Sequence, residues 1–378
     1  MSAKNADPLS PERFWRNTKH LKSARKKALR VAETLWEQRQ RAAEKAKANG
    51  NNTAEKARAF ALHHSGQAHT AFFHNQLKPL ISKLPKRFQA IEVGAGMGLL
   101  AALLAAYGNQ QGKTGSVLAT EMYWLQDSPT AFQHAGTYAH LLTQEPALRR
   151  VLKVHSNSQG LPLHTTYHQK RLKLCIASAH ELPTPANRFH LVYSLNCLEH
   201  IPNLSAYTQE AHRVLKPGGL FFNSTMPLYA SCFGHHCQDF YPLPWGHLLW
   251  EPQEFARLIL KGSRGHVEWT PGTPLTEQHI IKEILPTLNA YTPKDFRKSL
   301  RSRPWKVEGL VEHIHPNDAI LAKELGLPAA LKTLGPEDFT IHGLTLLLRK
   351  TKGPSWSPAL NLSHGMRKTI RLVTRVIE

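Results

Sequence analysis

Short apolar runs alternate with helical stretches from about residue 88 to residue 225. Five runs have the length of buried strands, at residues 90–93, 116–120, 172–178, 190–194 and 220–224. Segments with helical spacing of apolar positions, such as residues 99–107 and 206–215, lie between them. This alternation is typical of an α/β fold with a parallel, doubly wound sheet. Two further apolar runs follow at residues 307–311 and 339–348.

Two connections are longer than a simple crossover requires. The first runs from residue 122 to residue 171, and the second occupies residues 226–304, where aromatic residues and prolines are frequent. Insertions of this size usually recognise a ligand or cover a site. We therefore expect a main domain at residues 61–350, in which residues 226–304 form a recognition insertion after the fifth strand.

The two ends of the chain are basic and helical in pattern. Residues 1–60 begin a helix near Ser10 and Pro11, and a thin apolar stripe follows at Phe14, Leu21, Ala28, Leu35 and Trp36. This N-terminal extension is either a solvated helix or a clamp for a polyanion. Residues 351–378 are expected to form a basic amphipathic tail.

Composition is that of a globular protein, with 41% hydrophobic and 20% charged residues. The 48 Lys and Arg residues exceed the 27 Asp and Glu residues, so the formal net charge is +21, which favours acidic partners. Four cysteines are too few for a disulfide scaffold and indicate a reducing compartment. No signal-peptide core is apparent, and the longest apolar run, residues 99–107, is too short to cross a bilayer. We expect no transmembrane segment and a cytoplasmic location.

A glycine-rich turn follows the first strand and reads Glu92-Val93-Gly94-Ala95-Gly96-Met97-Gly98. Glycines allow a ligand to approach the backbone, and the N–H groups of the following helix favour a carboxylate or phosphate. A dinucleotide fingerprint has the spacing G-x-G-x-x-G, whereas the third glycine comes one residue earlier here. The spacing therefore argues against a nicotinamide dinucleotide.

Glu121 closes the second predicted strand. A carboxylate at this place can accept hydrogen bonds from both ribose hydroxyls of an adenosine. The alternative is an exposed acid at a strand end with no ligand.

These residues resemble class I S-adenosylmethionine-dependent methyltransferases. Four further segments follow the same family in order and spacing: AHELP at residues 179–183, FHLVYS at 189–194, LEHI at 198–201 and RVLKPGG at 213–219. The resemblance covers about residues 75–225 and, more loosely, residues 305–350. It implies a Rossmann-like doubly wound fold, in which a seven-stranded, mostly parallel sheet has helices on both faces.

The resemblance also implies S-adenosylmethionine as the cofactor and gives roles to individual residues. Glu92 would fix the methionine amino end, Glu121 would hold the ribose, and the turn residues Gly94, Ala95, Gly96 and Gly98 would line the cofactor. The family usually has an acidic residue after the third strand, where this chain has Ser178. Contacts to adenine are therefore expected from Ala179, His180 or Glu181. Asn196 and Cys197 are expected near the transferable methyl.

Candidate acceptor chemistry lies in the insertion, between residues 229 and 247. His235, His236 or His247 could be a general base oriented by Asp239. Alternatively, a metal could bind in this loop, because its side chains are of types that ligate metals. They are Cys232, His235, His236, Cys237 and Asp239. A third interpretation is that these side chains only pack. We assign no metal here, and we interpret His200 as a structural residue beside the cofactor.

The resemblance favours a methyltransferase that acts on a small-molecule, glycan or lipid-linked acceptor, with oxygen as the methylated atom. The net charge keeps an RNA or DNA methyltransferase as the alternative, together with an anionic partner for the N-terminal segment. Against it, the fourth strand leads into no Asp/Asn-Pro-Pro-Tyr/Phe motif, and Cys197 is not preceded by proline. A protein that binds the cofactor without catalysis is the third hypothesis.

Overall fold

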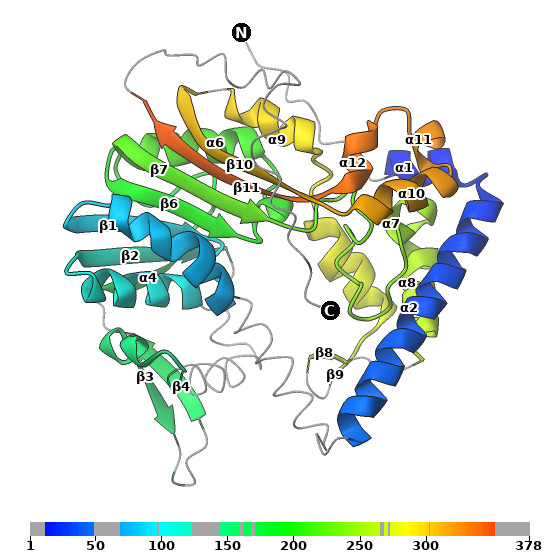
Figure 1. Ribbon diagram of the computed structural model, residues 1–378, viewed down its shortest axis with the longest axis horizontal. Helices are drawn as coiled ribbons and strands as arrows, with labels where there is room; N and C mark the ends of the chain where they lie inside the picture. Colours follow the sequence, from blue (N-terminus) through cyan, green and yellow to red (C-terminus); the bar gives the residue numbers. More distant parts are fainter. Residues whose placement is uncertain are drawn as a thin grey trace.

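Seven strands form one sheet, in the order β10-β11-β7-β6-β1-β2-β5 (Figure 1). The computed structural model describes residues 12–48, 69–96, 98–122, 142, 144–156, 158, 162–167, 171–264, 268–270, 273–301 and 303–351. The strands are β1 (Arg87–Val93), β2 (Thr114–Glu121), β5 (Leu172–Ile176), β6 (Phe189–Leu195), β7 (Leu215–Thr225), β10 (Trp305–Ile314) and β11 (Ile341–Lys350). The predicted seven-stranded sheet is confirmed.

Strand direction explains where a ligand can bind. β1 pairs in parallel with both β2 and β6, and β11 runs antiparallel to β7 and β10. From β1 the chain first builds one side of the sheet, through β2 to β5, and then the other side, from β6. The carboxyl ends of β1 and β6 therefore flank a topological switch point, which is the usual ligand site of open α/β sheets.

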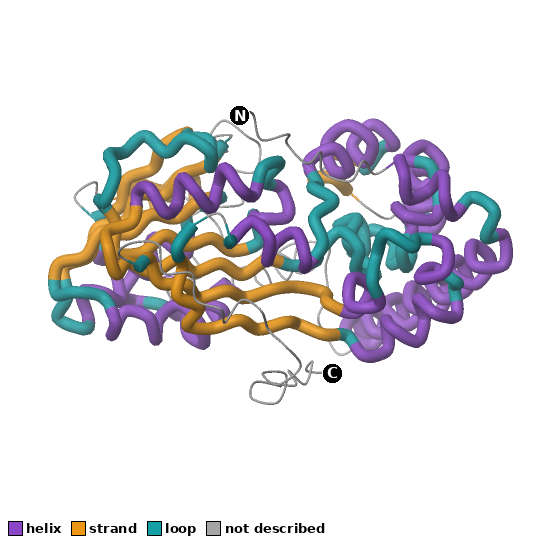
Figure 2. The backbone as a smooth tube through the Cα atoms, turned by 90° about the horizontal axis from the view of Figure 1, so that it is seen from above, coloured by secondary structure: helices purple, strands orange, loops and turns teal. Residues whose placement is uncertain are grey.

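Helices cover both faces of the sheet, as predicted (Figure 2). On one face lie the π-helix η1 (Phe73–Leu77), the 3-10 helices η2 (Lys78–Lys83) and η3 (Pro146–Arg150), and α4 (Leu99–Gln110). On the other lie α6 (Leu204–Val214) and α9 (Pro293–Leu300). α4 has apolar side chains almost all round and is buried over most of its length. It thus positions the glycine turn from which it starts.

The first long connection contains a two-stranded hairpin outside the main sheet. β3 (Leu152–Ser156) pairs antiparallel with β4 (Pro162–Tyr167). The sequence pattern predicts no strand here, because polar residues interrupt both segments and no clear apolar run marks them. Most of residues 123–143 lie outside the described part of the chain.

A second hydrophobic core lies beside the sheet, in what we call the helical lobe (Figures 1 and 2). The insertion contributes α7 (Gly246–Leu249), α8 (Pro252–Gly262), η5 (His279–Ile284), η6 (Leu285–Thr287) and the short pair β8 (Glu268–Thr270) and β9 (Thr273–Pro274). The connection between β10 and β11 adds α10 (Pro316–Glu324), α11 (Leu327–Ala330) and α12 (Pro336–Thr340). The ring centroids of Trp245 and Phe339 are 6.4 Å apart, so the two segments pack together.

The N-terminal helices complete this lobe. They are α1 (Glu12–Thr18) and the 27-residue α2 (Lys22–Ala48). Phe14 and Trp36 are buried, together with a stripe of alanines at Ala24, Ala28 and Ala32. Side chains four residues apart lie on one face of a helix, and alanine lets that face approach closely. The extension is therefore part of a core, and only its other face is solvated.

Polar contacts also fasten α1 and α2 to the lobe. The hydroxyl of Thr18 donates to the carbonyl of Leu248, and Lys27 pairs with Glu324 at 2.6 Å. Arg39 donates to the carbonyl of Gln238. Part of the basic charge of this segment is thus used within the chain. Residues 1–11, 49–68 and 352–378, including the predicted helix cap and the C-terminal tail, lie outside the described residues. No helix in the described segments is both long enough and apolar enough to cross a membrane.

Candidate active site

The glycine turn after β1 has one packed and one open position. Gly94, Gly96 and Gly98 have φ values of +68°, +50° and +77°, which favour glycine. A Cβ on Gly94 would lie 2.2 Å from Sγ of Cys197, whereas a Cβ on Gly96 would meet no protein atom within 4 Å. The N–H of Ala95 donates to the carbonyl of Thr120 at 2.9 Å and ties the turn to β2. Gly94 therefore packs the turn against the end of β6, and Gly96 leaves room for a ligand.

Glu121 lies at this turn, at the end of β2. One carboxylate oxygen accepts the N–H of Gly96 at 2.8 Å, and the other accepts the N–H of Met122 at 2.8 Å. The side chain is half-buried. It therefore holds the turn and lies at the strand end where the sequence predicts a ribose contact.

Two exposed apolar side chains lie next to this carboxylate, and the sequence motifs do not identify them. Met122 is 55% exposed and Ile176, which pairs with Glu121 in the sheet, is 63% exposed. Exposed apolar groups of this size at adjacent strand ends can cover a flat ring. Ala179 and His180 follow in the turn after β5, where the N–H of His180 donates to Oγ of Ser178. Their predicted contact with adenine stays a prediction.

Glu92 is only 2% exposed. Its carboxyl group lies beside Tyr193, whose hydroxyl is 3.2 Å away, and near the backbone of Ala101 in the first turn of α4. Burial raises the pKa of Glu92 to about 8, although the hydrogen bonds from Tyr193 and Ala101 act in the opposite direction. The role that the resemblance gives Glu92, at the methionine amino end, stays a prediction.

The raised pKa predicts how stability depends on pH. In the unfolded chain Glu92 loses its proton near its ordinary pKa of 4.5, whereas in the folded chain it keeps the proton up to about pH 8. The unfolded state therefore binds fewer protons between these values, and this group lowers stability as pH rises from about 4.5 to 8. Glu92→Gln should stabilise the protein relative to the wild type at pH 8.5 and not at pH 5. Thermal unfolding at the two pH values measures this, and parallel curves for both proteins would contradict it.

The end of β6 approaches the same turn. Asn196 is exposed with a φ of +47°, and its N–H donates to the carbonyl of Ser224 at 2.8 Å. Cys197 follows and packs on Gly94. Burial, and then the nearby charges of Glu199 and Glu121, raise the pKa of Cys197 to about 12. The thiol is therefore neutral at physiological pH and is no nucleophile.

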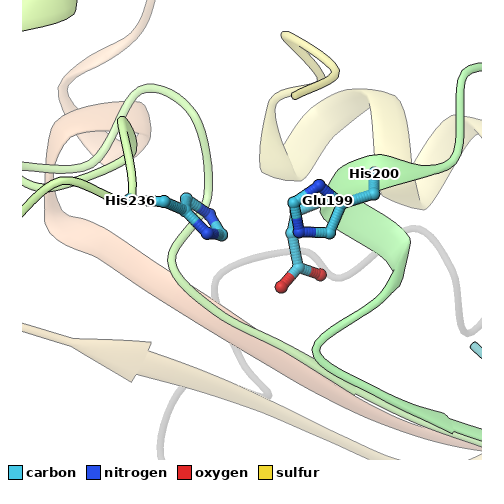
Figure 3. A group of neighbouring side chains, drawn as sticks. All are labelled: Glu199, His200 and His236. Carbon is cyan, nitrogen blue, oxygen red and sulfur yellow. The ribbon is translucent and has the colours of Figure 1, made fainter. Parts of the chain in front are cut away.

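Three side chains come together just past this strand: Glu199, His200 and His236 (Figure 3). Glu199 and His200 lie on the 3-10 helix η4 (Leu198–His200), and His236 comes from the insertion. One nitrogen or oxygen of each lies within 4.8 Å of the others, and the two imidazole centroids are 5.2 Å apart. Glu199 is 3% exposed and accepts the hydroxyl of Thr225. His200 is exposed as a whole residue, but the groups around its ring partly desolvate it and lower its pKa, which the hydrogen bond to Thr287 and the charge of Glu121 partly offset.

The other predicted catalytic residues lie elsewhere. His235 is buried, where it donates to the carbonyl of Leu243 and accepts the N–H of Cys237, both at 2.9 Å. His247 is buried as well and donates to the carbonyl of Tyr229 at 2.6 Å. Burial lowers the pKa of His235 and brings that of His247 to about 3. Both histidines therefore hold the insertion's own backbone.

Asp239 is exposed and does not join the group formed by Glu199, His200 and His236. Cys232 and Cys237 are buried free thiols and do not join it either. Of the loop residues predicted for catalysis or for metal binding, the structure brings only His236 to Glu199 and His200. The backbone of His236, with a φ of +59°, directs its ring differently from that of His235. Local sequence carries no signal for this difference.

Comparisons with known proteins identify one region of the chain. A family model described as a methyltransferase domain matches residues 134–223, which include β5, β6 and most of β7 but not the glycine turn. A ubiquinone biosynthesis O-methyltransferase of Methylobacterium sp. (strain 4-46) is 29% identical over 129 residues, which are 32% of this chain and 48% of that protein. A sterol 24-C-methyltransferase of Pneumocystis carinii (strain B80) is 35% identical over 69 residues, 18% of this chain and 16% of that protein. The chain thus spans less than half the length of either curated relative.

Solved structures with a related arrangement include two methyltransferases of low identity. A putative sarcosine dimethylglycine methyltransferase from Galdieria sulphuraria is 13% identical with a TM-score of 0.35, over 76% of this chain and 86% of that one. A geranyl diphosphate C-methyltransferase from Streptomyces coelicolor A3(2) is 8% identical with a TM-score of 0.38, over 76% of this chain and 85% of that one.

Proposed function

We propose that this chain, which belongs to the class I S-adenosylmethionine-dependent methyltransferases, methylates an acceptor hydroxyl held beside Glu199, His200 and His236. The strongest support is that the predicted cofactor residues and the two histidines lie together at the switch point of the sheet. The glycine turn with Glu121 lies on one side, and the two histidines lie on the other. The charge of Glu121 raises the pKa of His200, so the two groups are close enough to interact.

The residues at the strand ends fit S-adenosylmethionine. A Cβ on Gly96 would meet no atom of the described residues within 4 Å, Glu121 lies where a ribose would come, and Met122 and Ile176 expose apolar surface for the adenine ring. When bound, the cofactor supplies a methyl group on a sulfonium. The chain's part is to hold the acceptor oxygen in line with that methyl, which accounts for most of the catalysis in such displacements.

A hydroxyl acceptor must also lose its proton, and His200 is suited to accept it. Its Nδ1 lies 3.3 Å from the carbonyl oxygen of Thr287, to which it can donate. Its Nε2 then carries a lone pair. Burial lowers the pKa of His200, so the ring is neutral near pH 7 and can act as a base. By its name, the relative from Methylobacterium is an O-methyltransferase, which supports oxygen as the acceptor atom.

Transfer of labelled methyl tests the proposal. The purified protein is incubated with methyl-labelled S-adenosylmethionine and, in separate reactions, with a catechol, an oligosaccharide and total RNA. We expect label on a hydroxyl of the catechol or of the oligosaccharide. RNA is included because of the net charge of +21, and label only in RNA would overturn the proposal.

A variant at the cofactor site serves as the control. Glu121→Ala should weaken binding of S-adenosylmethionine by about 1–3 kcal/mol, because it removes the acceptor for hydrogen bonds at this edge. Calorimetry measures the affinity. Unchanged affinity in Glu121→Ala would place the cofactor elsewhere.

A further inference from the structure

We infer that Glu199, His200 and His236 form a binding site for a divalent transition-metal ion. Two imidazoles and one carboxylate are a known ligand set of catalytic zinc sites, which keep a further position open for water or substrate. The three ligand atoms lie within 4.8 Å of one another. In a tetrahedral zinc site with bonds of about 2.0–2.1 Å, two ligand atoms lie about 3.3 Å apart. The group therefore needs to contract by up to about 1.5 Å to close around an ion.

Each of the three side chains has one atom held by the protein and another left free. Glu199 accepts the hydroxyl of Thr225 with one oxygen, and its other oxygen, Oε1, is buried and has no hydrogen-bond partner among the described residues. His236 bonds to the backbone of Pro227, and its Nε2 is buried without a partner. His200 holds Thr287 through Nδ1. Second contacts of this kind orient metal-binding histidines and fix the nitrogen that faces the ion.

The unpartnered atoms need an explanation, because buried polar atoms in folded proteins are nearly always satisfied. When Glu199 is ionised, its free oxygen and the imidazole nitrogen of His236 both accept, so they cannot bond to each other. A cation between them would satisfy both at once. Because two ligands are nitrogen, Zn²⁺, Co²⁺ or a similar ion suits the site better than Mg²⁺ or Ca²⁺, which prefer oxygen.

Exposure differs among the three residues in a way that fits an open site. Glu199 is 3% exposed and His236 is half-buried, whereas His200 is exposed. A ligand from solvent can thus reach a bound ion beside the proposed cofactor position. This step rests on the proposed function: an acceptor hydroxyl bound to the ion would release its proton to water more readily. The ion would then take over the activation that a free His200 would otherwise supply.

Metal binding can be measured without any methyl transfer. The protein is prepared without a histidine tag, stripped with a chelator and titrated with Co²⁺, whose visible absorption reports coordination. We expect one tight equivalent that Zn²⁺ displaces. Glu199→Gln and His200→Gln should each weaken it at least tenfold. Glu199→Gln keeps an acceptor for Thr225, and His200 is exposed, so both variants should fold.

His20→Gln, an exposed histidine in the turn between α1 and α2, is the matched control and should leave the tight equivalent unchanged. Circular dichroism melting checks the fold of each variant. Equal Co²⁺ affinity in the wild type, Glu199→Gln and His200→Gln would overturn the inference. Methyl transfer that persists in the chelated protein with no tight Co²⁺ equivalent would reject the metal and leave the proposed function standing. One tightly bound Co²⁺ with no methyl transfer to any hydroxyl would support the metal site and reject the proposed function.

Discussion

Replacing His200 with alanine should lower the rate of methyl transfer by about 10²–10⁴-fold, the usual contribution of a group that handles the acceptor's proton. Affinity for S-adenosylmethionine should stay the same, because we propose that the glycine turn and Glu121, and not His200, contact the cofactor. The imidazole is exposed and fixed by Thr287, so its loss removes a reactive group without opening the core. Single-turnover rates with labelled cofactor, together with calorimetry, separate the two quantities.

Thr287→Val provides a graded comparison for this variant. It removes the hydroxyl 3.2 Å from Nδ1 of His200 but keeps the backbone carbonyl. The ring then keeps one of its two polar contacts, and the rate should fall by no more than about tenfold. If His200→Ala turns over as fast as the wild type, the acceptor is not activated at this cluster.

Gly94→Ala should lower the free energy of unfolding by about 2–5 kcal/mol and weaken cofactor binding with it. A left-handed backbone costs a non-glycine residue about 1–2 kcal/mol, and overpacking adds about 1–3 kcal/mol. The second cost arises because the new Cβ would lie 2.2 Å from Sγ and 2.6 Å from Cβ of Cys197. To relieve it, the turn must move away from the end of β6, which displaces the Gly96 backbone that faces the cofactor.

Gly112→Ala separates the two costs. Gly112 has the same φ of +68°, but a Cβ there would meet nothing within 4 Å. Gly112→Ala should lower the free energy of unfolding by only about 1–2 kcal/mol. It should leave cofactor binding unchanged. Chemical denaturation gives both free energies. Equal losses in the two variants would mean that contact with Cys197 adds nothing.

The strands and the family could be predicted because their signals are local. Apolar runs and a glycine turn repeat at fixed short spacings, and all seven predicted strands occur in the sheet. The helical lobe could not be predicted in the same way. The alanine stripe at Ala24, Ala28 and Ala32 is weakly apolar, and the other segments of its core begin only at residue 229. No short spacing records such a contact.

In the candidate site too, residues in local motifs could be predicted, and contacts between distant segments could not. The sequence places Glu121 and the glycines correctly at the strand ends, since the motif and the strand share one stretch of chain. Among His235, His236 and His247 it offers no choice, because three histidines in one loop look alike until the backbone turns. His200 could be singled out from the sequence because it lies in the LEHI motif. That His236 is its neighbour could be seen only in the folded structure.

The packing of α1 and α2 has a consequence for how the protein is made. Lys27 pairs with Glu324, 297 positions further along the chain, and Phe14 packs on Tyr229. The ribosome therefore releases these helices long before their partners exist. Until residues 229–241 have emerged, the apolar face around Phe14 and Trp36 stays uncovered, and exposed apolar surface of this kind is a risk for aggregation. The basic residues on the opposite face give the nascent segment a strong positive charge, and mutual repulsion between such segments would keep them apart while synthesis continues.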